Sequence, residues 1–268
     1  YKRQIISLLT MAWLPESPRY DSRRGRTERA MRTFQRIYPH ASEAYCRRRA
    51  EELTLSLQEF DTRVAHTPLA RRIRLLCSGT HARALVIACG LQALQQLCGF
   101  NTLMYYSGTL FQAIGFDQPV AVSLIVSATN FLATLAALQL IDMIGRRRVL
   151  LYSVPGMWGA LVFAAICFAF LPVQANGELA ADIPSGRRVW TYLVIVAIIV
   201  YVLFYGFGIG NVPWQQGELF AIETRAIGTS IATGVNWACN LLIGATYLSL
   251  VGAATSSGAF GFYAGLCA

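Results

Sequence analysis

Charged residues are scarce in this chain of 268 residues, and long stretches contain none at all. Asp, Glu, Lys and Arg together make up 14% of the residues, whereas hydrophobic residues make up 55%. Five windows lack Asp, Glu, Lys, Arg and His completely: 84–113, 119–141, 149–171, 190–214 and 226–251. Each window exceeds the roughly 20 residues that a helix needs to cross the hydrocarbon core of a bilayer. This scarcity excludes an ordinary soluble domain and predicts an all-α polytopic membrane protein.

Further absences narrow the function. The 7 cysteines are scattered without a C-x-x-C pair, which favours small hydrophobic packing residues over metal ligands or disulfides. Nothing arranges a nucleophile with a base, so we predict no enzyme, no cofactor and no metal site. The basic stretch lacks the interleaved aromatic residues that stack on bases, so we predict no nucleic-acid partner. Because the windows hold no carboxylate or histidine, no residue within the predicted spans can carry a proton.

The basic residues, which give a net charge of +9, set the predicted orientation. Arginines are dense in 3–83, before the first window, and recur at 146–148, between the second and third windows. Arg225 stands just before the fifth window, and the alternate connections hold few basic residues. The positive-inside rule then places the Arg-rich connections in the cytoplasm, where they also suit contact with anionic lipid. We expect a multi-pass integral protein of the plasma membrane.

Composition divides the chain into four parts: 1–14, 15–83, 84–251 and 252–268. The first part is too short to cross a membrane and is predicted to be the cytoplasmic end of a truncated span, because the chain does not begin with Met. The second part is predicted to be a cytoplasmic loop with short amphipathic helices at 27–38 and 42–60. These helices brace the spans or lie on the membrane surface, and we favour bracing. The third part contains the five spans, and the fourth is predicted to be an outer loop and the start of a truncated helix.

The first window, 84–113, is interrupted by polar residues. Gln92, Gln95 and Gln96 fall on one helical face, close to Asn101. Amides are costly against lipid, so this face is predicted to point into the protein. The amides serve either as interhelical hydrogen bonds or as a site for a ligand rich in hydroxyl groups, and we favour the ligand site.

The fourth window, 190–214, is interrupted by glycines and ends at Trp214. A pair of segments interrupted by glycine or proline points to the binding site of a transporter. Asn130 in the second window, with Asn236 and Asn240 in the fifth, adds further amides within the spans. An indole plate with amides around its rim is suited to a neutral polyol.

Charged motifs recur at the predicted cytoplasmic ends of the spans. Carboxylates and guanidinium groups from different helices can pair in one conformation and separate in another, which makes an ion-pair gate. The alternative is plain anchoring of the spans by arginine. Taken as a set, the charges favour a gate formed by Glu16, Arg19, Asp142, Arg146, Glu218 and Arg225.

Six motifs in order resemble those in the C-terminal half of the sugar porters of the major facilitator superfamily. They are Pro15-Glu16-Ser17-Pro18-Arg19, Gln95-Gln96-x-x-Gly99-x-Asn101 with Tyr105-Tyr106, Asp142-x-x-Gly145-Arg146-Arg147, Pro213-Trp214, Glu218-Leu219-Phe220 with Arg225, and Asn236-Trp237. The resemblance covers nearly the whole chain. It implies a 12-helix transporter of two halves, each built of inverted three-helix repeats, with the substrate between the halves. The truncated spans then correspond to the sixth and twelfth helices.

This resemblance implies roles for single residues. The substrate-binding residues it implies are Gln92, Gln95, Gln96, Asn101, Asn130, Trp214 and Asn236. The charged set listed above becomes the inner gate, and Tyr105 and Tyr106 become an outer gate. The implied function is secondary active transport of a small sugar or polyol by alternating access, with protons carried by the missing N-terminal half.

Two departures from the family pattern bear on the substrate. Glucose carriers of this family usually have a Glu eight residues before the tenth-helix Trp, where this chain has Gly206. The family's Glu-Leu-Phe-Pro reads Glu-Leu-Phe-Ala at 218–221, which loosens the turn. The stretch 210–218 resembles fungal proton-coupled myo-inositol transporters, so we rank myo-inositol above hexose. A non-transporting nutrient sensor and an inactive truncated product stay as alternatives.

Overall fold

The computed structural model describes residues 10–11, 14–65, 68–113, 119–171 and 188–268. Every regular element within these ranges is a helix, which confirms the predicted all-α class. The chain divides into two compact units, Tyr1–Arg74 and Leu75–Ala268, and each unit is described by itself.

The first unit is a small helical bundle. It contains α2 (Pro18–Arg23), α3 (Thr27–Ile37) and α4 (Glu43–Ala65), and α5 (Leu69–Leu76) begins at its end. Proline suits the first position of α2 because its missing N–H has no intrahelical partner there. The helices pack through small buried side chains, such as Ala30 and Cys46.

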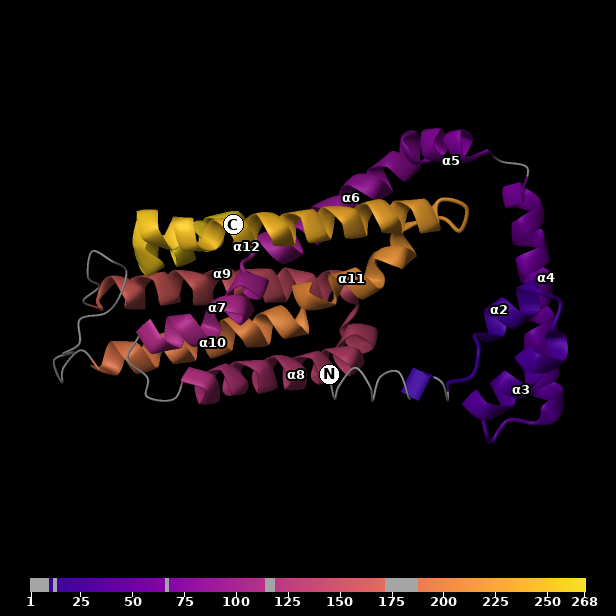
Figure 1. Ribbon diagram of the computed structural model, residues 1–268, viewed down its shortest axis with the longest axis horizontal. Coiled ribbons are helices and arrows are strands. Elements are labelled where there is room, and N and C mark those ends of the chain that lie inside the picture. Colours follow the sequence, from indigo (N-terminus) through magenta and orange to yellow (C-terminus); the bar gives the residue numbers. More distant parts are fainter. Residues whose placement is uncertain (1–9, 12–13, 66–67, 114–118, 172–187) are drawn as a thin grey trace. The chain divides into compact units, whose positions relative to one another are not determined.

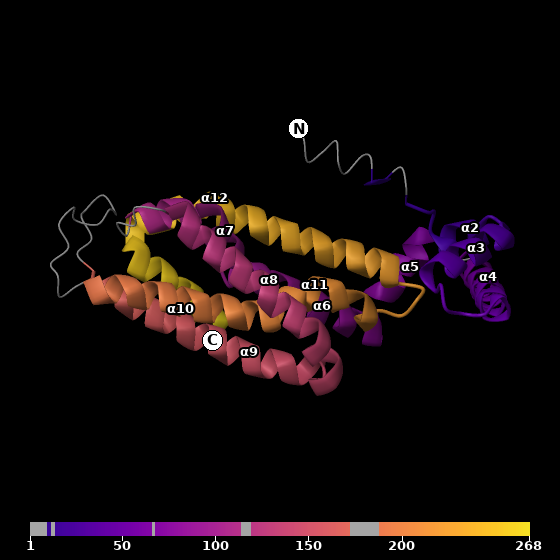
Figure 2. The same cartoon turned by 90° about the horizontal axis from the view of Figure 1, so that it is seen from below.

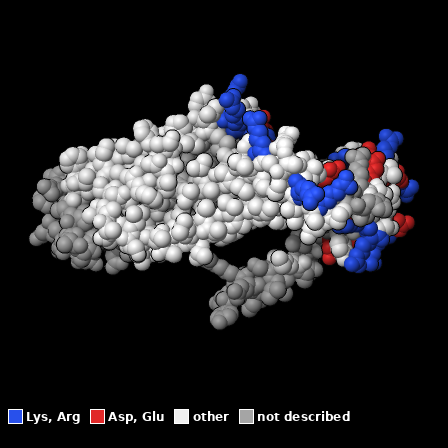
Figure 3. All heavy atoms as spheres, turned by 90° about the horizontal axis from the view of Figure 1, so that it is seen from above, with Lys and Arg blue, Asp and Glu red and all other residues white. Residues whose placement is uncertain are grey.

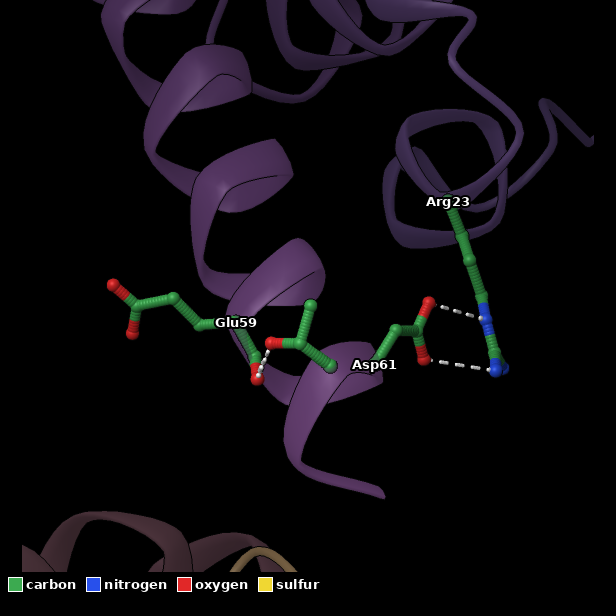
Figure 4. Close-up of polar contacts among 4 residues, drawn as sticks. Arg23, Glu59 and Asp61 are labelled. Carbon is green, nitrogen blue, oxygen red and sulfur yellow. Dashed lines mark hydrogen bonds and ion pairs between the residues drawn. The ribbon is translucent and has the colours of Figure 1, made fainter. Parts of the chain in front are cut away.

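An ion pair joins α2 to α4 in the first unit (Figure 4). The guanidinium of Arg23 donates to both carboxylate oxygens of Asp61, at 3.2 Å from Nε and 3.0 Å from Nη2. Next to Asp61, the hydroxyl of Thr62 donates to the backbone oxygen of Glu59 at 2.8 Å. The pair is solvent-exposed, so it fixes the direction of α2 more than it stabilises the fold.

The second unit consists of long apolar helices. These are α6 (Gly79–Leu97), α7 (Phe100–Ala113), α8 (Pro119–Ile144), α9 (Arg146–Ala169), α10 (Arg188–Phe207) and α12 (Arg225–Cys267). Among the described residues, five helical stretches are long and apolar enough to cross a membrane. Uncharged side chains cover most of the length of these helices on the face drawn in Figure 3.

The helices of the second unit pack in a bundle around a shared core. α9 lies beside α10 and α12, α8 lies beside α10, and α6 lies beside α12 (Figures 1 and 2). Large buried side chains, among them Tyr201, Phe168 and Met157, fill the space between α9 and α10 and their neighbours. This packing fixes where the polar residues of α6 and α12 meet.

The first interrupted window is broken at Gly99. α6 ends at Leu97 and α7 begins at Phe100, so the window predicted as one span forms two helices. Gly99 has φ +87°, a left-handed conformation that favours glycine, and a Cβ there would lie 2.8 Å from the ring of Tyr263. Only glycine satisfies both the turn and the close approach, so the predicted break is confirmed.

The second interrupted window is broken at Gly208, where α10 has ended. Three short turns follow: η2 (Ile209–Asn211), α11 (Val212–Gln215) and η3 (Gln216–Leu219). A Cβ at Gly208 would collide with the side chain of Ser153. The amide of Asn211 donates to the backbone oxygen of Gly206 at 2.8 Å, which satisfies a carbonyl that the break frees.

The C-terminal part of the chain turns back within α12. Thr255 is non-helical, with φ 62° and ψ 173°, and the helix after it runs to Cys267 (Figure 2). The hydroxyl of Ser257 donates to the backbone oxygen of Ala165 at 2.8 Å, and Phe260 stacks on Phe168 with centroids 5.0 Å apart. The sequence predicted an outer loop and the start of a truncated helix in 252–268; in the structure the chain reverses direction at Thr255 and is helical again from there to Cys267.

Candidate functional site

The amide face of α6 is buried against α12. Gln92, Gln95 and Gln96 are all buried, as the cost of exposing amides to lipid predicted. On α12, Thr233, Asn236 and Asn240 follow one another at three- and four-residue spacing and so share a face. The two faces meet and form one hydrogen-bond network.

Asn236 lies at the centre of this network. Its amide nitrogen is 2.7 Å from Oε1 of Gln92, 2.6 Å from Oε1 of Gln95 and 3.2 Å from the backbone oxygen of Gln92. Its oxygen accepts a 2.8 Å hydrogen bond from Nε2 of Gln96. One residue of α12 therefore engages the whole amide face of α6.

The network extends from Gln96 into α7. The oxygen of Gln96 accepts from Nδ2 of Asn101 at 2.6 Å and from Nδ2 of Asn240 at 3.0 Å. The hydroxyl of Tyr105 approaches Oδ1 of Asn240 at 3.4 Å. Asn101 lies in the first turn of α7, just after the break at Gly99. The turn at Gly99 therefore places Asn101 next to Gln96 at the end of α6.

Two further arms reach the second broken segment. Gln95 donates to the hydroxyl of Tyr205 at 2.5 Å, and the ring of Tyr205 stacks on Phe100 with centroids 3.7 Å apart. Gln92 donates to Oε1 of Gln216 at 2.8 Å, and Gln216 donates to the hydroxyl of Thr233 at 3.1 Å. The amide network thus joins both broken segments to α12.

The network is electrically neutral and built of groups that both donate and accept. A hydroxyl group does the same, so ligand hydroxyls can replace amide–amide bonds without leaving a buried polar atom unpaired. In this structure the amides bond to one another across helices, which was the alternative to ligand binding. Both uses employ the same residues: Gln92, Gln95, Gln96, Asn101 and Asn236.

Asn130 and Trp214 lie apart from the hydrogen-bonded cluster. In the described part of the chain, the buried Oδ1 of Asn130 on α8 has no hydrogen-bond partner. It lies close to Gly206, where a Cβ would be 3.1 Å from it and 2.8 Å from Cβ of Ala133. The side chain of Trp214 on α11 is 73% exposed, so its indole is free to meet another surface.

The predicted gate residues are brought together only in part. Arg146 forms a two-point pair with Glu218, at 2.7 Å from Nε and 2.8 Å from Nη2, and lies 3.9 Å from Asp142. Arg225 instead donates to the backbone oxygen of Phe220 at 3.4 Å. Within the second unit, therefore, Arg146 and not Arg225 joins the carboxylates.

The other residues predicted to form gates lie outside the cluster around Arg146. Glu16 and Arg19 belong to the first unit, so their part in a gate stays a prediction. Tyr105 is exposed, whereas Tyr106 donates to the backbone oxygen of Gly244 at 3.2 Å and stacks on Tyr247. Tyr106 therefore ties α7 to α12.

Sequence reasoning named Asn240 beside Asn236 but gave no role to three other members of the network: Tyr205, Gln216 and Thr233. Thr233 could have been found by following the face of Asn236 three residues back. Tyr205 lies in the last turn of α10, on a face that no other polar residue marked. Gln216 follows the second break, where helical spacing no longer indicates which way a side chain points.

Comparisons with known proteins agree on one family. The family model described as "Sugar (and other) transporter" matches residues 3–268. The chain is 48% identical over 263 residues to Myo-inositol transporter 1 of Cryptococcus neoformans, covering 98% of this chain and 46% of that protein. It is 44% identical over 262 residues to Myo-inositol transporter 1 of Saccharomyces cerevisiae, covering 97% and 45%. The chain therefore spans about half the length of these relatives.

Solved structures show the same fold. A structure of the proton:xylose symporter XylE superposes with a TM-score of 0.71 at 21% identity and covers 98% of this chain and 51% of that one. A partially occluded inward-open structure of XylE from E. coli gives a TM-score of 0.71 at 20% identity, with 98% and 49% covered. Both are structures of a transporter of the major facilitator superfamily.

Proposed function

The chain belongs to the family of sugar and other transporters, and from this we propose that it holds the substrate site of a secondary transporter for myo-inositol or a related polyol. The transporter works by alternating access and sits in the plasma membrane. The relatives named as myo-inositol transporters support this substrate. Proton coupling is assigned to residues outside this chain, because the charge-free windows contain no protonatable carboxylate or histidine.

One observation carries the proposal: a neutral amide network joins the two segments broken inside apolar spans to α12. Gln92, Gln95, Gln96 and Asn236 present donors and acceptors in a buried place. A charged substrate would find no counter-charge among these side chains, whereas each hydroxyl of a polyol can replace one amide partner. Asn101 and Asn130 extend the set, and the exposed indole of Trp214 offers a plate for the C–H face of a ring.

The gate is proposed from the charged contacts. Arg146, Glu218 and Asp142 form the inner gate, and they separate when the cavity opens on that side. For Arg225, Glu16 and Arg19 a part in the gate stays a prediction from the sequence motifs. Tyr105 and Tyr106 close the opposite side, where Tyr106 already bridges α7 and α12.

A hexose is the second candidate substrate, because the same amides suit any hydroxylated ring. We rank hexose below myo-inositol because of Gly206. The close approach of Ala133 and Asn130 leaves no room at this position for the side chain that glucose carriers usually have.

Uptake tests the proposal directly. The protein is expressed from its complete coding sequence in cells that lack their own inositol and hexose uptake, and labelled myo-inositol and glucose are supplied in parallel. We expect saturable uptake of myo-inositol with weaker uptake of glucose. Gln96→Leu should raise KM for myo-inositol, whereas Gln215→Leu, next to the network but outside it, should not. Surface expression without uptake of either compound would overturn the transporter assignment and favour a sensor or an inactive product.

A further inference from the structure

Two side chains of one short turn reach two different sites. Gln216 and Glu218 both belong to η3, which is only four residues long, Gln216–Leu219. Gln216 joins the amide network, and Glu218 joins the ion pair with Arg146. Since a 3₁₀ helix rises about 2 Å per residue, the two attachment points lie roughly 4 Å apart along one rigid turn.

Gln216 has both ends of its amide engaged. Its oxygen accepts a 2.8 Å hydrogen bond from Gln92 and its nitrogen donates to Thr233 at 3.1 Å. Gln92 also contacts Asn236 through its other amide atom, at 2.7 Å. A ligand hydroxyl that takes over Gln92 therefore competes directly with Gln216.

Glu218 is held as firmly on its side of the turn. Both of its carboxylate oxygens accept from Arg146, at the junction of α8 and α9. The next anchor is Phe220, which is buried against Gly228, where a Cβ would lie 2.5 Å from its ring. Phe220 thus anchors the end of η3 to α12, and the bond from Gln216 to Thr233 anchors its start there, so little loose chain is left to absorb a shift between Gln216 and Glu218.

We propose that Gln216 is a positioning residue that couples occupancy of the amide site to the Arg146–Glu218 pair through η3. This rests on the proposed transport function and deepens it. When a polyol hydroxyl engages Gln92, the Gln92–Gln216 bond is exchanged, η3 moves as a unit, and the pair at its other side rearranges. Arg146 and Glu218 then respond to substrate that never touches them.

The test measures the response of the ion-pair region to substrate. A reporter cysteine, Arg147→Cys in a Cys77→Ser background, is placed in the full-length protein in inside-out vesicles. Its rate of labelling by a maleimide is measured with and without saturating myo-inositol. In the otherwise unaltered protein the rate should change on addition of myo-inositol. In Gln216→Leu that change should fall roughly three- to fifteen-fold, the factor that one interhelical hydrogen bond in a membrane controls.

Matched variants separate positioning from mere packing. Thr233→Val removes the hydroxyl that anchors Gln216 and should weaken the response in the same way, whereas Thr233→Ser keeps the hydroxyl and should restore it. Gln215→Leu, one residue away on the same segment, should respond as the parent does. If Gln216→Leu does not reach the membrane, the two Thr233 variants give the answer on their own.

A second comparison uses the pair itself. Once Glu218→Gln has weakened the ion pair, adding Gln216→Leu should cause little further loss of response, because both act through one turn. Uptake by the parent protein is measured in the same vesicles, and its absence overturns the transport proposal. Uptake with an undiminished labelling response in both Gln216→Leu and Thr233→Val overturns the coupling alone.

Discussion

The side chains of Gln96 and Asn236 are joined by a 2.8 Å hydrogen bond across 140 residues of chain. Asn236 is only 7% exposed, and the same amide also reaches Gln92 and Gln95. This bond therefore fixes the register between α6 and α12 and places three amides around one point. The ligand site and the packing of two spans depend on the same contact.

Removing Asn236 should damage both affinity and stability. Asn236→Leu keeps the branching of the side chain but leaves the amides of Gln92, Gln95 and Gln96 without their shared partner. Buried polar groups left unpaired cost about 1–3 kcal/mol, so the free energy of unfolding should fall by about that amount and KM for myo-inositol should rise. Thermal denaturation of the solubilised protein and uptake kinetics measure the two effects.

Asn240→Leu is the matched control for Asn236→Leu. Asn240 stands one turn further along α12 and donates only to Gln96, at 3.0 Å. Its loss should lower the stability less than the loss of Asn236. If both variants lower the free energy of unfolding equally, the central position of Asn236 in the network adds nothing to stability.

Helical spacing predicted which amides of α6 share a face, and their role as a substrate site stays a prediction. The shared face of Gln92, Gln95 and Gln96 follows from 3.6 residues per turn. Position 99 requires glycine because its backbone is left-handed, a conformation in which a residue with a Cβ is strained. The structure adds that Asn236 is the partner of that face, because pairing across 140 residues is set by packing and leaves no trace in local spacing.

Spacing fails where the helix ends. Gln216 stands in a 3₁₀ turn, so the direction of its side chain depends on the geometry of the break. Thr255 is a harder case, since a β-branched residue at φ 62° carries none of the usual signals for a turn. The sequence predicted an outer loop and the start of a truncated helix in 252–268, but it did not single out Thr255 as the residue at which the chain reverses.

Trp214 should matter for uptake and not for the fold of this unit. Its side chain is 73% exposed, so Trp214→Ala removes little buried surface and should leave the melting temperature nearly unchanged. KM for myo-inositol should rise about two- to twelvefold if the indole packs on the ring, since aromatic contacts are worth about 0.5–1.5 kcal/mol. The KM of Trp214→Phe should lie between those of the parent protein and Trp214→Ala. Trp158→Ala, which removes another partly exposed indole on α9, should leave KM unchanged; an equal rise in KM there would argue against a specific plate.

The pair between Arg146 and Glu218 should depend on two opposite charges and not on either residue alone. Arg146→Glu and Glu218→Arg should each speed labelling of a cysteine at position 147 and lower the rate of uptake. The double variant, with the charges exchanged, should recover a substantial part of both. Arg147→Glu in a separate protein is the control for added negative charge, because Arg147 takes no part in the pair. A double variant worse than both single ones would show that the pair does not hold a gate.

Gly206 should be intolerant of even one added carbon, since α10 approaches α8 closely there. A Cβ would lie 2.8 Å from Cβ of Ala133 and 3.1 Å from Oδ1 of Asn130, and Ala133 is buried. Gly206→Ala should therefore lower the free energy of unfolding by about 1–3 kcal/mol, although alanine is the better helix former. Gly159→Ala is the matched control: no atom lies within 4 Å of its added Cβ, so it should be neutral or stabilising.

A compensating change separates crowding at Gly206 from other effects of the substitution. Ala133→Gly removes the carbon nearest to the new one, so the double variant Gly206→Ala with Ala133→Gly should recover most of the melting temperature that Gly206→Ala loses. It should also recover uptake, because Asn130 can then keep its place beside α10. Recovery of stability without recovery of uptake would mean that displacement of Asn130 is not what lowers uptake in Gly206→Ala. A double variant as unstable as Gly206→Ala would show that contact between α8 and α10 is not what requires glycine here.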